Sequence, residues 1–204
     1  MTGIINDPHE LQKLIRRRRR LGIDRHDEVW DGVYIVSPQP NVEHQQVVYL
    51  LSLSFGISIQ LPGLGLVLPG INVSDRAEGW TKNYRCPDVA VFLNGTSAQN
   101  LGTHWLGGPD FAVEVLSKGD RARKKFAFYA AVGTRELLLI DRRPWALELY
   151  RLDGGELRLV GKSTLESPDV LASGVLPLSF RLAEGQPRPT ISVAHADGVQ
   201  AWSA

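Results

Sequence analysis

Two short apolar segments decide how this sequence is interpreted: PDVAV at residues 87–91 and FAVEVLS at residues 111–117. Each segment is rich in valine and alanine, as buried strands are, and each carries one acidic residue, Asp88 or Glu114. Burying an ionised carboxylate costs free energy unless it has a partner. A hard cation such as Mg²⁺ is the simplest partner that two neighbouring carboxylates can share. The two segments therefore predict a metal site on adjacent strands.

Each carboxylate also has a simpler explanation. A Pro-Asp pair often begins a turn, and Glu114 could lie on the exposed face of an edge strand. The apolar run after Asp88 favours a carboxylate at the start of a strand instead. The apolar residues on both sides of Glu114 favour a buried position.

Length and composition indicate one ordinary globular domain over residues 1–204. A net charge of +1 means that any nucleic-acid binding must come from local basic clusters. Cys86 is the only cysteine, which excludes an intrachain disulfide and a cysteine-based zinc site. The first residues do not resemble a secretory signal, and no apolar run reaches the length of a membrane span. We therefore expect a cytoplasmic protein with no membrane association. Serine-hydrolase and zinc-peptidase motifs are absent from the sequence.

The remaining pattern predicts an α/β (α+β) domain with a central mixed β-sheet flanked by helices. The Asp31-Gly32 pair indicates a hairpin over residues 28–36. The expected helices span residues 8–20, 42–60 (largely buried, with Asn41 as N-cap) and 120–132. The expected strands span residues 65–73, 87–93, 111–116, 136–141, 146–152 and 156–160. Residues 94–109 read as a loop, and residues 177–204 form an extension without a clear pattern.

Five consecutive arginines, Arg16 to Arg20, close the first expected helix. They can be a solvated helix end, where cations suit the negative end of the helix dipole. They can also be a patch that contacts phosphates. Composition alone slightly favours the first interpretation.

Several short blocks in a fixed order resemble a known family. They are EVWDG at residues 28–32, Ser37-Pro38, His44, PDVAV, EVLS at residues 114–117, Lys125-x-x-x-Tyr129, and Gly133 before a strand that ends at Asp141. Together they span roughly residues 27–152 and resemble the Uma-two family of bacterial endonucleases, within the PD-(D/E)XK superfamily. The resemblance implies a restriction-endonuclease-like core and Mg²⁺- or Mn²⁺-dependent hydrolysis of phosphodiester bonds in DNA.

The resemblance also implies roles for individual residues. Asp88, Glu114 and the backbone carbonyl of Val115 would hold the metal, and a lysine would stabilise the transition state or orient water. In the simplest superfamily pattern that lysine lies two residues after the glutamate, where this chain has Leu116. In the Uma-two branch the lysine lies on the following helix, which makes Lys125 the first choice. Lys124 is the second choice and Lys118 the third.

Three further expectations concern residues around this centre. Glu28 matches an early glutamate of the family and would assist catalysis, although an exposed charge at a strand end is an equally good interpretation. His44 could support the metal ligands or carry a proton, but a hydrogen-bonded structural histidine is favoured. Arg121, Arg123 and Lys124 would contact phosphate.

DNA is the expected partner, and RNA is left open. A homodimer is possible, in which apolar C-terminal residues would line the interface: Leu176, Leu178, Phe180 and Trp202. The rival interpretation is a non-catalytic protein that keeps the nuclease fold for DNA binding or for assembly with a partner.

Overall fold

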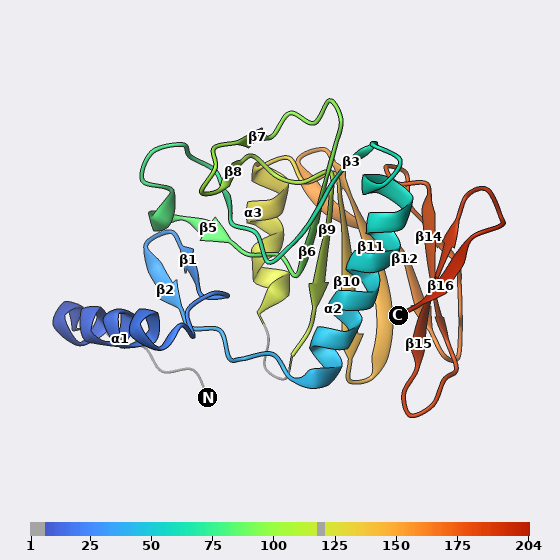
Figure 1. Ribbon diagram of the computed structural model, residues 1–204, viewed down its shortest axis with the longest axis horizontal. Helices are drawn as coiled ribbons and strands as arrows, with labels where there is room; N and C mark the ends of the chain where they lie inside the picture. Colours follow the sequence, from blue (N-terminus) through green and yellow to red (C-terminus); the bar gives the residue numbers. More distant parts are fainter. Residues whose placement is uncertain (1–6, 118–120) are drawn as a thin grey trace.

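A six-stranded mixed sheet forms the centre of the protein (Figure 1). The computed structural model describes residues 7–117 and 121–204. In spatial order the strands are β12 (Glu156–Thr164), β11 (Trp145–Asp153), β10 (Glu136–Arg142), β9 (Phe111–Val115), β6 (Val89–Leu93) and β3 (Gly65–Pro69). Strands β9 and β10 run parallel, and all the other neighbours run antiparallel. The predicted mixed sheet is confirmed.

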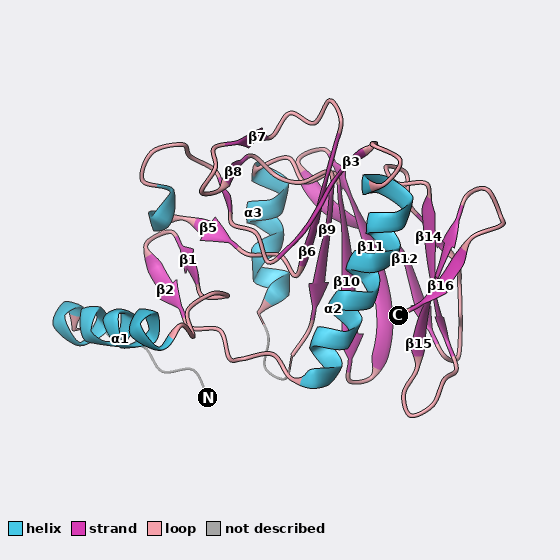
Figure 2. Ribbon diagram, in the orientation of Figure 1, coloured by secondary structure: helices cyan, strands magenta, loops and turns pink. Residues whose placement is uncertain are grey.

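Helices cover both faces of this sheet, as Figure 2 shows for α2 (Val42–Phe55) in front of it. Helix α2 is capped by Asn41 and continues into the π-helix η1 (Gly56–Gln60). Its buried side chains pack against the alternate residues Phe111, Val113 and Val115 of β9. Ala112 belongs instead to the core on the opposite face, where the 3₁₀ turn η3 (Ala122–Lys125) and helix α3 (Phe126–Ala131) pack. Because side chains alternate along a strand, Glu114 shares that second face.

A second six-stranded sheet carries the N-terminal hairpin beside α3. In spatial order it contains β2 (Val33–Ile35), β1 (Glu28–Trp30), β5 (Tyr84–Arg85), β4 (Val73–Ser74), β8 (Trp105–Leu106) and β7 (Gln99–Asn100). Asp31 and Gly32 both have positive φ angles, of 48° and 84°, as the predicted two-residue hairpin turn requires. A short 3₁₀ turn, η2 (Trp80–Lys82), lies before β5.

Helix α1 (Pro8–Leu21) precedes this hairpin and confirms the first predicted helix. Asp7 caps its start by accepting hydrogen bonds from the backbone N–H groups of His9 and Glu10. Gly22 ends it in the left-handed conformation. The helix projects from one end of the molecule (Figure 1).

The C-terminal segment forms a third, antiparallel sheet: β13 (Leu171–Ala172), β14 (Leu178–Ala183), β15 (Thr190–His195) and β16 (Ala201–Ser203). Leu176, Leu178 and Phe180 are buried in the core that this sheet shares with α2, and Trp202 packs against the same core. The expectation of a dimer interface is therefore wrong for Leu176, Leu178 and Phe180, and it stays a prediction for the half-buried Trp202. Alternation along β14 turns its apolar residues inward.

Other predicted boundaries also need correction. The single strand expected over residues 65–73 is divided, because Gly70 turns the chain with a φ of 63° and sends β4 into another sheet. The helix over residues 42–60 is buried on one face only, and Leu53 is 45% exposed. The expected loop over residues 94–109 contains β7 and β8. The start of the helix predicted over residues 120–132 falls partly outside the described residues, and the rest is η3 followed by α3. Within the described ranges, no helix has both the length and the apolar character that a membrane crossing needs.

Candidate active site

Glu114 forms the centre of a buried cluster between β9 and α3. Its two carboxylate oxygens lie 2.9 and 3.0 Å from the Lys125 ammonium nitrogen. The Tyr129 hydroxyl donates to Glu114 Oε1 at 2.5 Å. Lys125 and Tyr129 are four residues apart and therefore lie on one side of the helical turn. All three side chains are buried, so the prediction of a buried Glu114 is confirmed.

Glu28 reaches the same lysine from strand β1. Its Oε1 lies 2.9 Å from Lys125 Nζ and also accepts a hydrogen bond from the Cys86 N–H at 2.8 Å. Its Oε2 accepts from the Trp30 indole N–H at 2.6 Å. Glu28 is buried, so the alternative of an exposed charge at a strand end is wrong.

Asp88 lies immediately before β6 and is attached to β9 through both backbone and side chain. Its N–H donates to the Val113 carbonyl at 3.0 Å, and its Oδ2 accepts from the Val115 N–H at 2.7 Å. In an extended strand the N–H and C=O of one residue point to the same side. The Val115 carbonyl therefore points to the side of β9 on which Asp88 lies. The Asp88 side chain is 19% exposed, which makes it the member of the cluster most open to solvent.

His44, at the start of α2, holds the other oxygen of Asp88. Its Nε2 lies 3.2 Å from Asp88 Oδ1, and the imidazole is buried. A nitrogen that faces a carboxylate carries the proton, so Nε2–H is the donor. His44 Nδ1 is buried and has no hydrogen-bond partner among the described residues. The sequence favoured a purely structural histidine, whereas the structure places His44 against a predicted metal ligand.

Negative charge exceeds positive charge in this cluster. Burial raises the pKa of Glu114 to about 8 against the opposing pull of Lys125, and Asp88 and Glu28 raise it further. Burial lowers the pKa of Lys125, but the carboxylates of Glu114 and Glu28 outweigh burial and raise it overall, so it stays an ammonium. The cluster thus holds one lysine and three acidic side chains, and either a proton on Glu114 or an added cation would relieve the excess negative charge.

The oxygen donors match the preferences of a hard cation. Carboxylate oxygens of Asp88 and Glu114 and the carbonyl of Val115 are the ligand types that Mg²⁺ takes. Over residues 7–117 and 121–204, however, no three histidine, cysteine or acidic side chains are grouped as a ready metal-ligand set. A metal held here would therefore take the Val115 carbonyl or water beside the two carboxylates, and Glu114 would have to turn one oxygen away from Lys125.

Burial at Tyr129, reinforced by Glu114 and Glu28, raises the pKa of its phenol well above the ordinary value. Tyr129 therefore stays a hydrogen-bond donor to Glu114. Sequence reasoning used Tyr129 only to choose among the lysines and missed it as a member of the cluster. Its spacing of four residues from Lys125 was the available signal.

The predicted phosphate contacts differ in exposure and in their partners among the described residues. Lys124 is exposed and Arg121 is half-buried. Arg123 lies 2.8 Å from Glu148 and donates to the Tyr150 hydroxyl at 2.6 Å. Lys118 lies outside the described residues. Of the two described lysines, Lys125 contacts the carboxylates, as the sequence's first choice expects.

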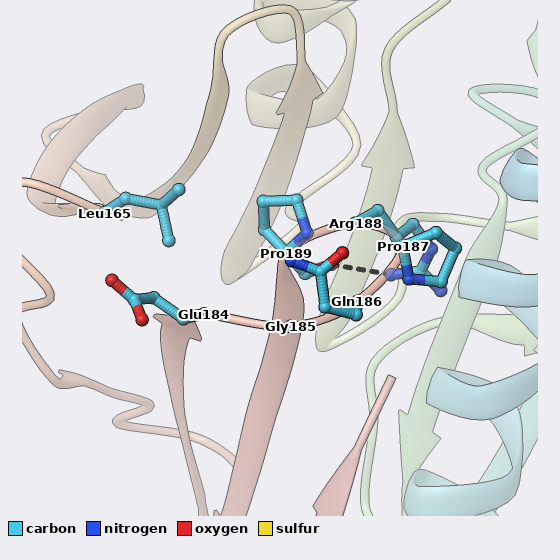
Figure 3. Close-up of a pocket in the computed structure, with 7 residues that line it drawn as sticks. All are labelled: Leu165, Glu184, Gly185, Gln186, Pro187, Arg188 and Pro189. Atoms are coloured by element: carbon cyan, nitrogen blue, oxygen red, sulfur yellow. Dashed lines mark hydrogen bonds between the residues drawn. The ribbon is translucent and has the colours of Figure 1, made fainter.

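A surface pocket at the turn between β14 and β15 is separate from this cluster (Figure 3). Leu165 and residues 184–189 line it, and Arg188 donates to the Pro189 carbonyl within it. None of the predicted site residues lines this pocket. The buried cluster around Lys125 is therefore the candidate active site.

The family of the chain follows from comparison with known proteins. The model of the family Uma2, described as "Putative restriction endonuclease", matches residues 12–184. The chain belongs to the Uma2 family. The match extends beyond both ends of the blocks that carry the sequence resemblance and includes the whole candidate site of this Uma2 chain.

A solved structure is similar to the fold of this Uma2 chain. It is the crystal structure of a putative nuclease belonging to DUF820 from Anabaena variabilis ATCC 29413, with a TM-score of 0.57 and 19% sequence identity. The similarity covers 72% of this chain and 80% of that one. At this identity the likeness shows the fold alone, and the fold is nuclease-like. No curated protein matches the chain significantly.

Proposed function

We propose that this protein is a Mg²⁺-dependent endonuclease that hydrolyses phosphodiester bonds in DNA. The observation that carries the proposal is the position of Lys125 Nζ, 2.9 Å from both Glu114 Oε1 and Glu28 Oε1 in a cluster that also includes Asp88. A buried ammonium beside oxygen ligands is the minimum set for phosphoryl chemistry. Membership of a family described as restriction endonucleases supports the same reaction class.

Asp88, Glu114 and the Val115 carbonyl would hold the metal. When bound, Mg²⁺ neutralises charge that develops on the phosphate and lowers the pKa of its coordinated water. Asp88 is fixed for this task, because His44 and the Val115 N–H hold its two oxygens. Restricting the rotation of a ligand in advance lowers the cost of binding.

Lys125 would act when Glu114 turns toward the metal. An ammonium has three N–H donors, and here they face two oxygens of Glu114 and one of Glu28. Moving one Glu114 oxygen releases one donor for a phosphate oxygen or for the attacking water. Glu28 keeps the ammonium in place during this change. Tyr129 keeps its hydrogen bond to Glu114 Oε1, so Oε2 is the oxygen that would turn toward the metal.

The three donors of the Lys125 ammonium all have acceptors, and this also supports the second candidate, a nuclease-fold protein that binds DNA or a partner without cutting. An ion cluster in which every lysine donor has an acceptor needs no substrate to complete it. Cleavage measurements separate the two candidates.

Cleavage of supercoiled plasmid with Mg²⁺ or Mn²⁺ tests the proposal in wild type, Asp88→Asn and Glu114→Gln. Glu136→Gln is the matched control, because Glu136 is also a buried, ion-paired glutamate of the central sheet. We expect metal-dependent nicking that falls at least ~100-fold in the two site variants and persists in the control, since each site variant removes a metal ligand. Folded wild-type protein that does not cleave in excess metal would support the binding role. Cleavage that survives in both site variants would show that the site is assigned wrongly.

A further inference from the structure

Helix α1 contributes nothing to the candidate active site, yet it carries the densest positive charge of the chain. Residues 1–25 contain seven of the 23 lysines and arginines but only three of the 22 acidic residues. The rest of the chain therefore has more acidic than basic side chains. Helix α1 buries none of its residues and projects from the molecule (Figure 1).

The two faces of α1 differ in character. At 100° per residue, Leu11, Leu14, Ile15 and Arg18 fall on one face, and all four are half-buried. The opposite face carries Lys13, Arg16, Arg17 and Arg20, and all four are exposed. The arginine run is therefore divided between a side turned toward the protein and a side turned toward solvent.

Arg18 anchors the inward face. Its guanidinium contacts both oxygens of Asp27, with Nε at 2.5 Å and Nη2 at 2.7 Å. The same Nη2 donates to the carbonyls of Ile23 at 2.6 Å and Ser37 at 3.1 Å. The Tyr34 hydroxyl donates to Asp27 as well. A bidentate pair with these additional acceptors fixes the direction of the helix.

This anchor is attached to the candidate active site through one peptide unit. Asp27, which holds Arg18, is followed directly by Glu28, which holds Lys125. Consecutive residues of an extended chain point to opposite sides. The start of β1 therefore fixes α1 on one side and the site lysine on the other.

The outward arginines are free to bind an anion. Among the described residues, none of Arg16, Arg17 and Arg20 has an acidic group within 4.0 Å, whereas Lys13 pairs with Glu10. An array of unpaired guanidinium groups on one helix face suits a polyanion with regularly spaced charges. A membrane surface is a poorer match, because the apolar face that would enter lipid is turned inward and held by Arg18.

We propose that Arg16, Arg17 and Arg20 bind backbone phosphates of duplex DNA, so that α1 is a rigid arm that extends the DNA contact beyond the catalytic cluster. The choice of DNA among polyanions rests on the proposed function. Arg18 is assigned to the anchor and not to the DNA. Phosphate contacts of this kind position the duplex and carry no sequence preference.

The test measures binding of the full chain to a fluorescein-labelled 24-base-pair duplex by fluorescence anisotropy, in EDTA, from 50 to 200 mM salt. The variant is Arg16→Gln/Arg17→Gln/Arg20→Gln, because glutamine keeps the helix propensity and removes the charge. The control removes the same number of exposed cations from the C-terminal half, Arg158→Gln/Lys162→Gln/Arg181→Gln, of which Arg158 and Lys162 are ion-paired. Circular dichroism checks that the variant keeps the helix content of the wild type.

We expect the α1 variant to bind ~10- to 100-fold more weakly than wild type at 100 mM salt. Its slope of log Kd against log salt should fall by about 2 to 3, at about 0.9 for each lost phosphate contact. The control should keep the wild-type slope. Equal binding by the variant and the control would overturn the proposal, and so would a wild type that binds no duplex or binds only single-stranded RNA or anionic vesicles. Plasmid cleavage is scored separately. Binding that depends on the three arginines, in a protein that does not cleave, would support the DNA-binding role of α1 and contradict the nuclease function. Cleavage together with binding that does not depend on these arginines would support the nuclease function and contradict the role of α1.

Discussion

Two glutamates of neighbouring parallel strands, Glu114 on β9 and Glu136 on β10, are both buried and both ion-paired, yet their surroundings differ. Glu136 accepts hydrogen bonds from the Arg151 guanidinium at 2.7 Å, the Ser173 hydroxyl at 2.5 Å and the Gly174 N–H at 2.9 Å. Its partner Arg151 has a side chain that is 44% exposed. Glu136 thus ties the third sheet to the central one.

Glu114 shares its single cationic partner with Glu28 and has Asp88 nearby. Its partner Lys125 is buried too. Burial of a glutamate is therefore no sign of function by itself. The informative difference is the local balance of charge, because only the Glu114 cluster has more acids than cations.

The largest expected effect comes from Lys125→Met, which leaves Glu28 and Glu114 buried without a cation. We expect the free energy of unfolding at pH 7 to fall by about 3–5 kcal/mol, because uncompensated buried charge is costly. Urea unfolding followed by circular dichroism measures this loss. A loss below about 1 kcal/mol would show that the Glu114 cluster depends on its cation no more than the Glu136–Arg151 pair does.

The pH dependence of stability separates the two glutamates next. The Glu114 pKa rises from its usual 4.5 to about 8 in the folded protein. Between these values the folded state holds a proton that the unfolded state has lost. The stability from Glu114 is therefore fully present below about pH 4.5 and is lost as pH rises through about 8. We expect a slope of at most about 1.4 kcal/mol per pH unit in unfolding experiments. Glu114→Gln should flatten that slope and Glu136→Gln should not, and an unchanged slope in Glu114→Gln would contradict the assignment.

Glu136→Gln should cost about 1.5–3 kcal/mol, because it weakens hydrogen bonds to a charged acceptor without leaving a large cavity. Thermal or urea unfolding measures the loss. Since Glu136 lies outside the candidate site, the metal-dependent cleavage rate should stay within about twofold of wild type. A large loss of cleavage together with normal stability would mean that Glu136 takes part in cleavage and that the roles of the two glutamates are assigned wrongly.

The smallest effect is expected for Arg151→Met. We expect a loss of about 1 kcal/mol, because the guanidinium is 44% exposed and the buried Glu136 keeps the Ser173 hydroxyl and the Gly174 N–H as donors. Replacing Lys125 and Arg151 by methionine in turn thus allows the two losses of unfolding free energy to be compared in one assay. Equal losses of unfolding free energy at Lys125 and Arg151 would show that the two ion-paired clusters do not differ.

Sequence alone predicted the central sheet, because its strands carry strong local patterns. The run FAVEV identifies Glu114 as a carboxylate in a buried strand, whereas the choice of Lys125 came from the family resemblance, through the block Lys125-x-x-x-Tyr129. The contact between Lys125 and Glu28 joins residues that are far apart in the chain, and no periodicity reports such a pairing. The positions of Glu28 and His44 against the cluster likewise depend on tertiary packing.

The errors have local causes. Gly70 interrupts an apolar run that otherwise reads as one strand. Strands β13 and β14 lie between prolines and lack a strong sequence pattern, so the sequence predicts Leu178 and Phe180 at an interface, whereas alternation along β14 turns them into the core. From the sequence, the five arginines are interpreted together as one group. The structure separates Arg18, which faces the protein, from its neighbours.

The adjacency of Asp27 and Glu28 limits how this region can change in length. Exposed hairpins usually accept insertions and deletions readily. Here the gain of one residue between Asp27 and Glu28 would turn both acids to the same side, because each step along an extended chain reverses the side-chain direction. Either Arg18 or Lys125 would then lose its acceptor. Among related sequences, these two acids should therefore stay adjacent even where the residues around them vary.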